Sequence, residues 1–215
     1  MKVKEAGLSE DEINARANEK AKKRKEARDR MLATKTIAQK GLLIVHTGKG
    51  KGKSTAAFGL AVRALGNGMR IGIVQFVKGK WGTGERVVLE KFPDQVTIRA
   101  MGEGFTWDTQ DRARDIAAAT AAWAEAKRMI EACRGDSPQY DMLVFDELNI
   151  VLRYDYLDIA EVVNVLGGRP EMLHIVVTGR NAKEEMIEAA DLVTEMTEIK
   201  HPFRAGVKAQ KGIEF

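Results

Sequence analysis

Apolar residues in this chain occur in short runs separated by longer amphipathic stretches. From Gly41 onward, five runs have the length and composition of buried strands: GLLIVH (41–46), RIGIVQF (70–76), VTIRA (96–100), MLVFD (142–146) and LHIVVTG (173–179). Stretches with helical spacing lie between them, among them 54–66, 111–133, 158–168 and 182–191. This alternation predicts an α/β fold with a mostly parallel sheet and helices on both faces. In such folds, ligands bind at the carboxyl ends of the strands.

The first forty residues follow a different pattern. Ser9 and Glu12 have the spacing of a capping box, and residues 10–32 then read as one long helix with few apolar positions. Residues 1–40 contain 12 Lys and Arg against 7 Asp and Glu, whereas the rest of the chain contains 23 against 24. We therefore expect a basic helical arm at 1–40 and a separate domain at 41–215. The arm is either a solvated helix or a contact for something anionic.

Composition narrows the classes of function. No apolar run approaches the length of a membrane span, and the first residues lack the apolar region of a secretory signal. The single cysteine, Cys133, cannot form an internal disulfide. We expect a cytoplasmic protein that does not act at membranes. The near-neutral charge of 41–215 argues against a broad surface for nucleic acid.

The segment HTGKGKGKST (46–55) links the first predicted strand to the first predicted helix of this domain. A P-loop consists of glycine, four residues and Gly-Lys-Ser/Thr, and here Thr47 stands at the first glycine position. Glycines allow backbone amides to converge on phosphate oxygens, and the following helix adds its positive end. The alternative is a solvated Lys/Gly turn. The predicted ATP-binding residues are Thr47, Gly48, Lys49, Gly50, Lys51, Gly52, Lys53, Ser54 and Thr55.

Two carboxylates follow the apolar run MLVF. P-loop proteins place an acid at such a strand end to hold a divalent metal opposite the hydroxyl of the loop, so Asp146 or Glu147 would act with Ser54. The alternative is a strand that ends in a polar turn. Together, the loop and the carboxylates predict binding of a nucleoside triphosphate with Mg²⁺ or Mn²⁺.

The residues do not define an obvious proton-transfer pair. Gln75 and Arg180, each near the end of a predicted strand, are candidates for positioning water or stabilising a transferred phosphate. The histidines are scattered, and His174 lies within an apolar run, where a structural role is expected. Phe105 and Trp107 follow a predicted strand and would share one side of an extended segment. They either form an apolar wall for a large planar ligand or pack beneath a loop.

These segments together resemble one family, the ATP:corrinoid adenosyltransferases of corrinoid biosynthesis. The resemblance extends from Gly41 to Phe215, and Thr47 at the first glycine position is also typical of the family. The motifs that carry it are TGKGKGKST (47–55), AAFGLAVRALG (56–66), VQFVKGKW (74–81), GFTWDTQ (104–110), FDELN (145–149), YDYL (154–157), VVTGR (176–180) and AGVKAQKGIEF (205–215).

The resemblance implies a reaction in which a reduced Co(I) corrinoid attacks the 5′ carbon of ATP and triphosphate leaves. Co(I) carries no proton, so no general base is required. By position, Lys53 and the amides of 48–54 would hold the triphosphate, reversed relative to most P-loop proteins. Ser54 with Glu147, and with Asp146, would hold the metal. The cofactor implied is Mg²⁺ or Mn²⁺, and the substrates are ATP and a corrinoid.

Other roles also come from the resemblance alone. Arg63 and Arg180 match positions near the nucleotide. Phe105 and Trp107 match aromatic residues that displace the lower axial ligand of the corrinoid, which makes cobalt easier to reduce. A reductase that donates electrons, a homodimer, and an arm that closes over the active site are expected as well.

Three other functions remain open from the residues. A RecA-like ATPase acting on nucleic acid would share the loop, the strand pattern and the basic arm, and would release phosphate when nucleic acid is added. A small-molecule kinase would release ADP. A binding module would carry ATP or a corrinoid without reaction. The identity of the phosphate product separates all of these from the transferase.

Overall fold

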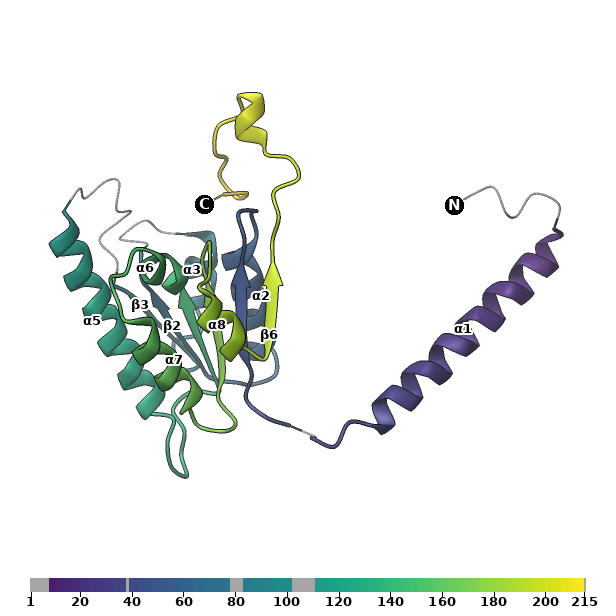
Figure 1. The fold of residues 1–215 in the computed structure, drawn as a ribbon, viewed down its shortest axis with the longest axis horizontal. Coiled ribbons are helices and arrows are strands. Elements are labelled where there is room, and N and C mark those ends of the chain that lie inside the picture. Colours follow the sequence, from purple (N-terminus) through teal and green to yellow (C-terminus); the bar gives the residue numbers. More distant parts are fainter. Residues whose placement is uncertain (1–7, 38, 78–82, 102–110, 215) are drawn as a thin grey trace. The chain divides into compact units, whose positions relative to one another are not determined.

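A computed structural model of the chain describes residues 8–37, 39–77, 83–101 and 111–214. The chain forms two compact units, Met1–Gln39 and Lys40–Phe215. The described part of the first unit contains one helix, α1 (Glu10–Ala33), drawn in purple in Figure 1. The predicted capping box is confirmed, because the amide of Ser9 donates to Glu12 Oε2 at 2.8 Å and the amide of Glu12 donates to Ser9 Oγ at 3.3 Å. No residue of α1 is buried.

The second unit is built on a parallel sheet of six strands. Its strand order is β3-β2-β4-β5-β1-β6, and every neighbouring pair in it is parallel. Because all strands run the same way, their carboxyl ends meet at one edge of the sheet (Figure 1). The strands are β1 (Leu43–Thr47), β2 (Ile71–Gln75), β3 (Val96–Ala100), β4 (Met142–Asp146), β5 (His174–Thr178) and β6 (Leu192–Glu195).

Helices connect the strands and cover both faces of this sheet. The predicted α/β fold, with a mostly parallel sheet and helices on both faces, is therefore confirmed. The described helices of this unit are α2 (Lys53–Leu65), α3 (Gly84–Leu89), α5 (Arg112–Glu131), α6 (Leu148–Arg153), α7 (Ile159–Gly167), α8 (Glu184–Ala189) and the 3₁₀ helix η1 (Pro202–Ala205).

Alternating side chains of the strands divide the core into two clusters. On one face, Trp123 of α5 packs against Phe145 of β4 with ring centroids 6.3 Å apart and nearly perpendicular planes. On the other face, Phe58 of α2 lies in a cluster with Ile44 and Val144 of the strands. Both surfaces of the central strands are buried, which explains why the sequence shows continuous apolar runs there rather than alternation.

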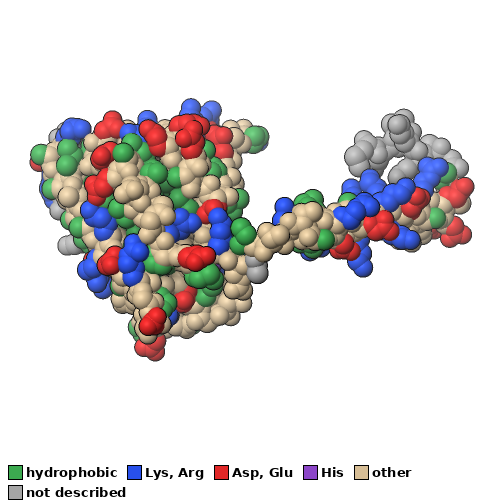
Figure 2. All heavy atoms as spheres, turned by 60° about the horizontal axis from the view of Figure 1, so that its bottom comes forward, with side chains coloured by type: hydrophobic (Ala, Val, Ile, Leu, Met, Phe, Trp, Pro, Cys, Tyr) green, Lys and Arg blue, Asp and Glu red, His purple; other side chains and the backbone are tan. Residues whose placement is uncertain are grey.

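One strand was not predicted. β6 lies beside β1 at the edge of the sheet, with Val45 opposite Val193, and most of its residues are exposed. Charges of both signs are interspersed over the face of the molecule that Figure 2 shows. Within the described ranges, no helix is long and apolar enough to cross a membrane.

Candidate active site

The segment between β1 and α2 forms a glycine-rich loop, residues 48–52, at the carboxyl edge of the sheet. Gly48 and Gly52 have φ angles of 96° and 104°, a region that side chains other than glycine rarely adopt. A Cβ atom at Gly48 would also collide with the carbonyl oxygen of Met196. Gly52 caps α2 with no side-chain hydrogen bond, and the first turn of α2 carries no acidic residue. The start of α2 is therefore suited to an anion.

Lysines of different exposure surround this anion site. Lys53, the first residue of α2, is only 7% exposed, and its Nζ donates to the carbonyl oxygen of Gly50 at 2.5 Å. Burial lowers the pKa of Lys53, nearby Arg180 and Lys51 lower it further, and Glu147 opposes them. Glu147 and Arg180 follow the ends of β4 and β5, at the same carboxyl edge of the sheet as the loop.

Two predicted loop residues already have partners in the protein. The amide of Gly50 donates to the carbonyl oxygen of Met196 at 2.6 Å, and the amide of Met196 donates to the carbonyl oxygen of Thr47 at 2.9 Å. The hydroxyl of Thr47 accepts a hydrogen bond from the amide of Ala182 at 2.9 Å. Thr47 and Gly50 therefore also hold the loop against the segment that follows β6 and against the approach to α8.

The two predicted carboxylates have different environments. Asp146 is 1% exposed and accepts hydrogen bonds from Thr178 Oγ1 at 2.8 Å and from Gln75 Nε2 at 3.4 Å. Glu147 is half-buried, has a left-handed φ of 64°, and donates its amide to Thr178 Oγ1 at 2.9 Å. Gln75 is thus held by Asp146. The negative charge of Glu147 opposes the lowering of the Lys53 pKa.

The donor chemistry fits a small divalent metal. Ser54 stands in the first turn of α2, and Asp146 and Glu147 end β4 at the same edge of the sheet. Among the described residues, no group of three or more His, Cys, Asp or Glu could hold a metal by itself. Magnesium commonly uses one or two protein oxygens together with phosphate oxygens and water, so the residues present fit a metal that arrives with the nucleotide.

One predicted nucleotide contact, Arg63, lies away from the loop. Arg63 is exposed in the last turn of α2, and a helical rise of about 1.5 Å per residue separates its backbone from that of Lys53 by about 15 Å. Thr55 is exposed in the first turn of the same helix. Phe105 and Trp107 lie outside the described residues, as do residues 78–82.

Within the described residues, neither His46 nor His174 forms a hydrogen bond or ion pair with an acidic side chain. His174 Nδ1 accepts from the amide of Leu42 at 3.2 Å, which is the structural role expected. His46 is 6% exposed, neither ring nitrogen has a hydrogen-bond partner in the described part of the chain, and burial lowers its pKa. The imidazole of His46 is therefore neutral near pH 7.

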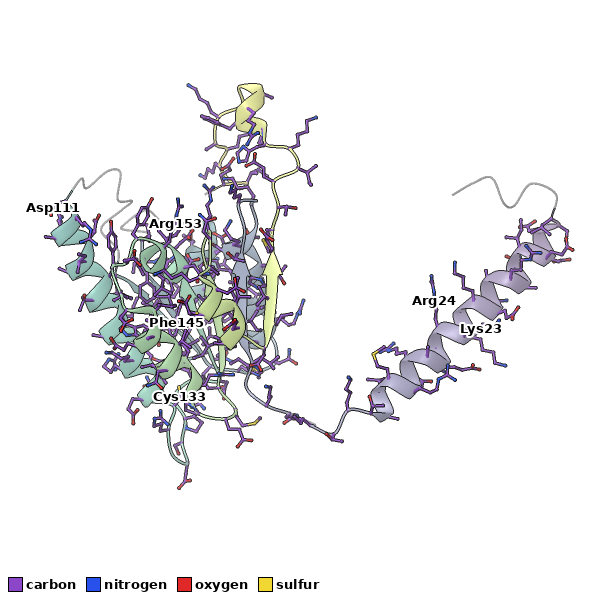
Figure 3. All side chains as sticks on the ribbon, in the orientation of Figure 1. Lys23, Arg24, Asp111, Cys133, Phe145 and Arg153 are labelled. Carbon is purple, nitrogen blue, oxygen red and sulfur yellow. The ribbon has the colours of Figure 1, made fainter. Side chains whose placement is uncertain are left out.

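Two further features near this edge were not assigned a role from the sequence. Tyr154 and Tyr156 stack with ring centroids 5.6 Å apart, and Arg153 lies over the ring of Tyr154 at 5.4 Å. Figure 3 shows Arg153 towards the same end of this unit as Asp111 and away from Cys133. The second feature is Glu214, which forms an ion pair with Lys51. Only the quoted motifs YDYL and AGVKAQKGIEF pointed to these segments.

Comparison with known proteins gives a consistent result. The sequence model of the family described as ATP:corrinoid adenosyltransferase BtuR/CobO/CobP matches residues 39–215. The chain is 56% identical to a corrinoid adenosyltransferase from Sinorhizobium sp, over 94% of this chain and 92% of that protein. It is 49% identical to a corrinoid adenosyltransferase from Pseudomonas aeruginosa, over 92% of this chain and all of that protein. For the corrinoid adenosyltransferase CobA of Salmonella typhimurium, the identity is 44%, over 95% and 99% of the two chains.

Proposed function

This chain belongs to the ATP:corrinoid adenosyltransferase family, and we propose that it transfers the 5′-deoxyadenosyl group of ATP to the Co(I) centre of a corrinoid. The observation that carries this proposal is the glycine-rich loop that leads into the start of α2, which has no side-chain cap and carries the buried Lys53 at its first position. Such a site suits a polyphosphate chain. A family match from residue 39 to 215 indicates which reaction the polyphosphate undergoes.

In the proposed reaction, the electron pair of Co(I) forms a cobalt–carbon bond to C5′ of ATP. The bond between C5′ and the triphosphate oxygen breaks, and its electron pair leaves with triphosphate. Cobalt passes formally from Co(I) to Co(III). No proton is transferred in this step, which agrees with a site whose buried histidine, His46, has no acidic partner in the described part of the chain.

The residues of this chain would contribute orientation and charge. Lys53 and Lys51, with the first amides of α2, would bind the triphosphate and stabilise the negative charge that develops on it. Arg180 would add a further positive charge to the site. Ser54 with Glu147, and Asp146 behind it, would hold Mg²⁺ or Mn²⁺, which neutralises phosphate charge when bound.

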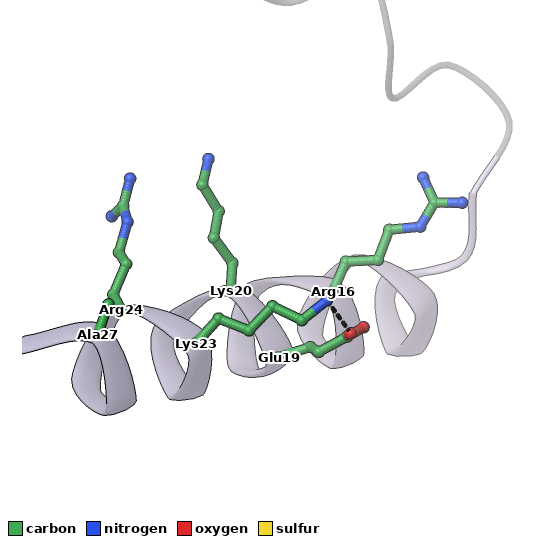
Figure 4. Close-up of a pocket in the computed structure, with 6 residues that line it drawn as sticks. All are labelled: Arg16, Glu19, Lys20, Lys23, Arg24 and Ala27. Atoms are coloured by element: carbon green, nitrogen blue, oxygen red, sulfur yellow. Dashed lines mark ion pairs between the residues drawn. The ribbon is translucent and has the colours of Figure 1, made fainter. Parts of the chain in front are cut away.

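The remaining family features are also part of this proposal. Phe105 and Trp107 would displace the lower axial ligand of the corrinoid, and an electron-donating reductase would supply Co(I). We further propose a cytoplasmic homodimer in which residues 1–40 act as a basic arm of the transferase domain, 41–215. The basic character of this arm is supported by α1, where one side carries the side chains of Arg16, Lys20 and Arg24 (Figure 4). Arg63 lies in the last turn of α2, so it would contact the nucleotide only in an arrangement of the protein that brings its side chain near a glycine-rich loop.

The test is an anaerobic reaction of the purified protein with MgATP and chemically reduced Co(I) corrinoid. We expect loss of the Co(I) absorbance, a light-sensitive alkylcorrinoid and free triphosphate. Phosphate or ADP as the product would instead indicate an ATPase or a kinase. An unchanged Co(I) spectrum would contradict the proposal, and nucleic acid would then be added to look for stimulated phosphate release.

A further inference from the structure

The C-terminal segment returns to the glycine-rich loop. In Figure 1 the yellow segment after β6 extends beyond the carboxyl edge of the sheet, and its end comes back beside the top of β1. There, the carboxylate of Glu214 forms an ion pair with Nζ of Lys51, a residue 163 positions earlier in the chain. The carboxylate of Glu214 is thus paired with Lys51, one of the cations that would bind triphosphate in the proposed function.

The position of this carboxylate is set by local structure. Gly212 has a φ of 79°, and the amide of Glu214 donates to the carbonyl oxygen of Gln210 at 2.9 Å, so a turn presents the side chain. The hydrogen bond from Lys51 lowers the pKa of Glu214, which is therefore ionised at neutral pH. The side chain of Glu214 is 20% exposed, against 56% for Lys51.

Little apolar packing holds the segment in place. Ile199, Phe203 and Ile213 are 92%, 74% and 81% exposed, so their burial cannot anchor it. Its firm attachment lies further back, where the backbone of Met196 bonds to the loop on both sides of Gly48. A segment with exposed side chains and few buried contacts opens at low free energy. Glu214 can therefore leave Lys51 while Met196 stays bound.

We propose that Glu214 is a displaceable internal anion, which pairs with Lys51 and competes there with the polyphosphate of ATP and with the triphosphate product. This inference rests on the proposed function, because it takes the loop as the polyphosphate site. Without ligand, Glu214 neutralises one of several cations crowded at the loop. With ligand, a more highly charged anion replaces it, and its return assists the release of triphosphate.

A purely structural role for Glu214 makes the opposite prediction. If the carboxylate held Lys51 in the geometry that binds phosphate, its removal would weaken binding. Competition predicts that its removal tightens binding. An exposed ion pair contributes little to stability or binding, so the expected gain in affinity is at most about fivefold. The gain should shrink as salt is added, because both interactions are screened.

The experiment uses the full chain and isothermal titration with inorganic tripolyphosphate and with MgATP. Glu214→Gln should bind tripolyphosphate about two- to fivefold more tightly than the wild type. Glu214→Asp, which keeps the charge, should restore most of the wild-type affinity. Glu171→Gln, which removes an exposed carboxylate from the turn before β5, should leave affinity unchanged. In a Lys51→Gln background, Glu214→Gln should have no further effect.

The outcomes distinguish a failure of the role proposed for Glu214 from a failure of the proposed function itself. Equal or weaker binding by Glu214→Gln, or an equal gain in Glu171→Gln, would overturn the role of Glu214. If wild type and Lys53→Ala both fail to bind tripolyphosphate, the loop is not the polyphosphate site and the proposed function itself fails. In steady-state assays, Glu214→Gln should lower KM for ATP and strengthen inhibition by tripolyphosphate, a change that a loss of folding would not produce.

Discussion

The helices α1 and α2 begin in opposite ways. α1 has Ser9 as its cap and acidic residues at its first three positions, so its own side chains satisfy the amides and the positive end. α2 begins after a glycine, has no acidic residue in its first turn and carries Lys53 there. The start of α1 is capped by its own side chains, whereas the start of α2 has no side-chain cap. This contrast supports the proposal that the start of α2 binds the polyphosphate.

The same two helices differ in what stabilises them. Phe58 of α2 is 3% exposed within a core cluster, whereas Leu32 of α1 is 56% exposed. We expect Phe58→Ala to lower the free energy of unfolding by about 3–5 kcal/mol, since it removes a buried ring and leaves a cavity. Leu32→Ala should change it by less than about 0.5 kcal/mol. Denaturant titration of both variants measures this, and similar losses would mean that α1 is packed.

The lysines of the two helices provide the next test. Lys53→Ala should weaken binding of MgATP about 10- to 150-fold, because hydrogen bonds to charged groups contribute about 1.5–3 kcal/mol. Lys25→Ala removes the same charge from an exposed position on α1 and is the matched control. Titration calorimetry at fixed salt gives both dissociation constants. Unchanged affinity in Lys53→Ala would refute the assignment of the loop.

The sequence predicted the elements whose pattern is local. The run at 41–46 became β1, and MLVFD became β4, because buried parallel strands require continuous apolar residues. β6 was missed because it is a short edge strand with mostly exposed residues, so it lacks the continuous apolar run of a buried strand. The short helices α3 and α6 were missed because a helix of 6 residues is too short to show a clear hydrophobic periodicity.

The features of the candidate site also divide into those with a local signal in the sequence and those that depend on the tertiary structure. Lys53, Asp146 and Glu147 were predicted, because a phosphate loop and a carboxylate at a strand end are local signals. The pairing of Glu214 with Lys51 depends on how the chain beyond β6 folds back, and no spacing in the sequence encodes it. The packing of Met196 against the loop is equally non-local. Contacts of this kind emerge only from the tertiary structure.

The smallest expected effect concerns the cap that makes α1 complete. Hydrogen bonds from the amide and hydroxyl of Ser9 lower the pKa of Glu12 below its ordinary value of 4.5. A carboxylate with a lowered pKa stabilises the folded form above the ordinary pKa, and this contribution is lost as the pH falls through the lowered value. Acidification below 4.5 should therefore fray the first turn of α1.

The measurement is the set of Cα chemical shifts of residues 10–13 by NMR as the pH is lowered. Glu12→Gln should reduce the pH dependence to the part that Glu10 and Asp11 contribute, and Ser9→Ala should fray the turn at neutral pH as well. The start of α2, with no carboxylate in its first turn, serves as the internal reference and should not change over the same range. If the chemical shifts at both helix starts changed alike, the proposed distinction between the self-capped α1 and the uncapped α2 would be wrong.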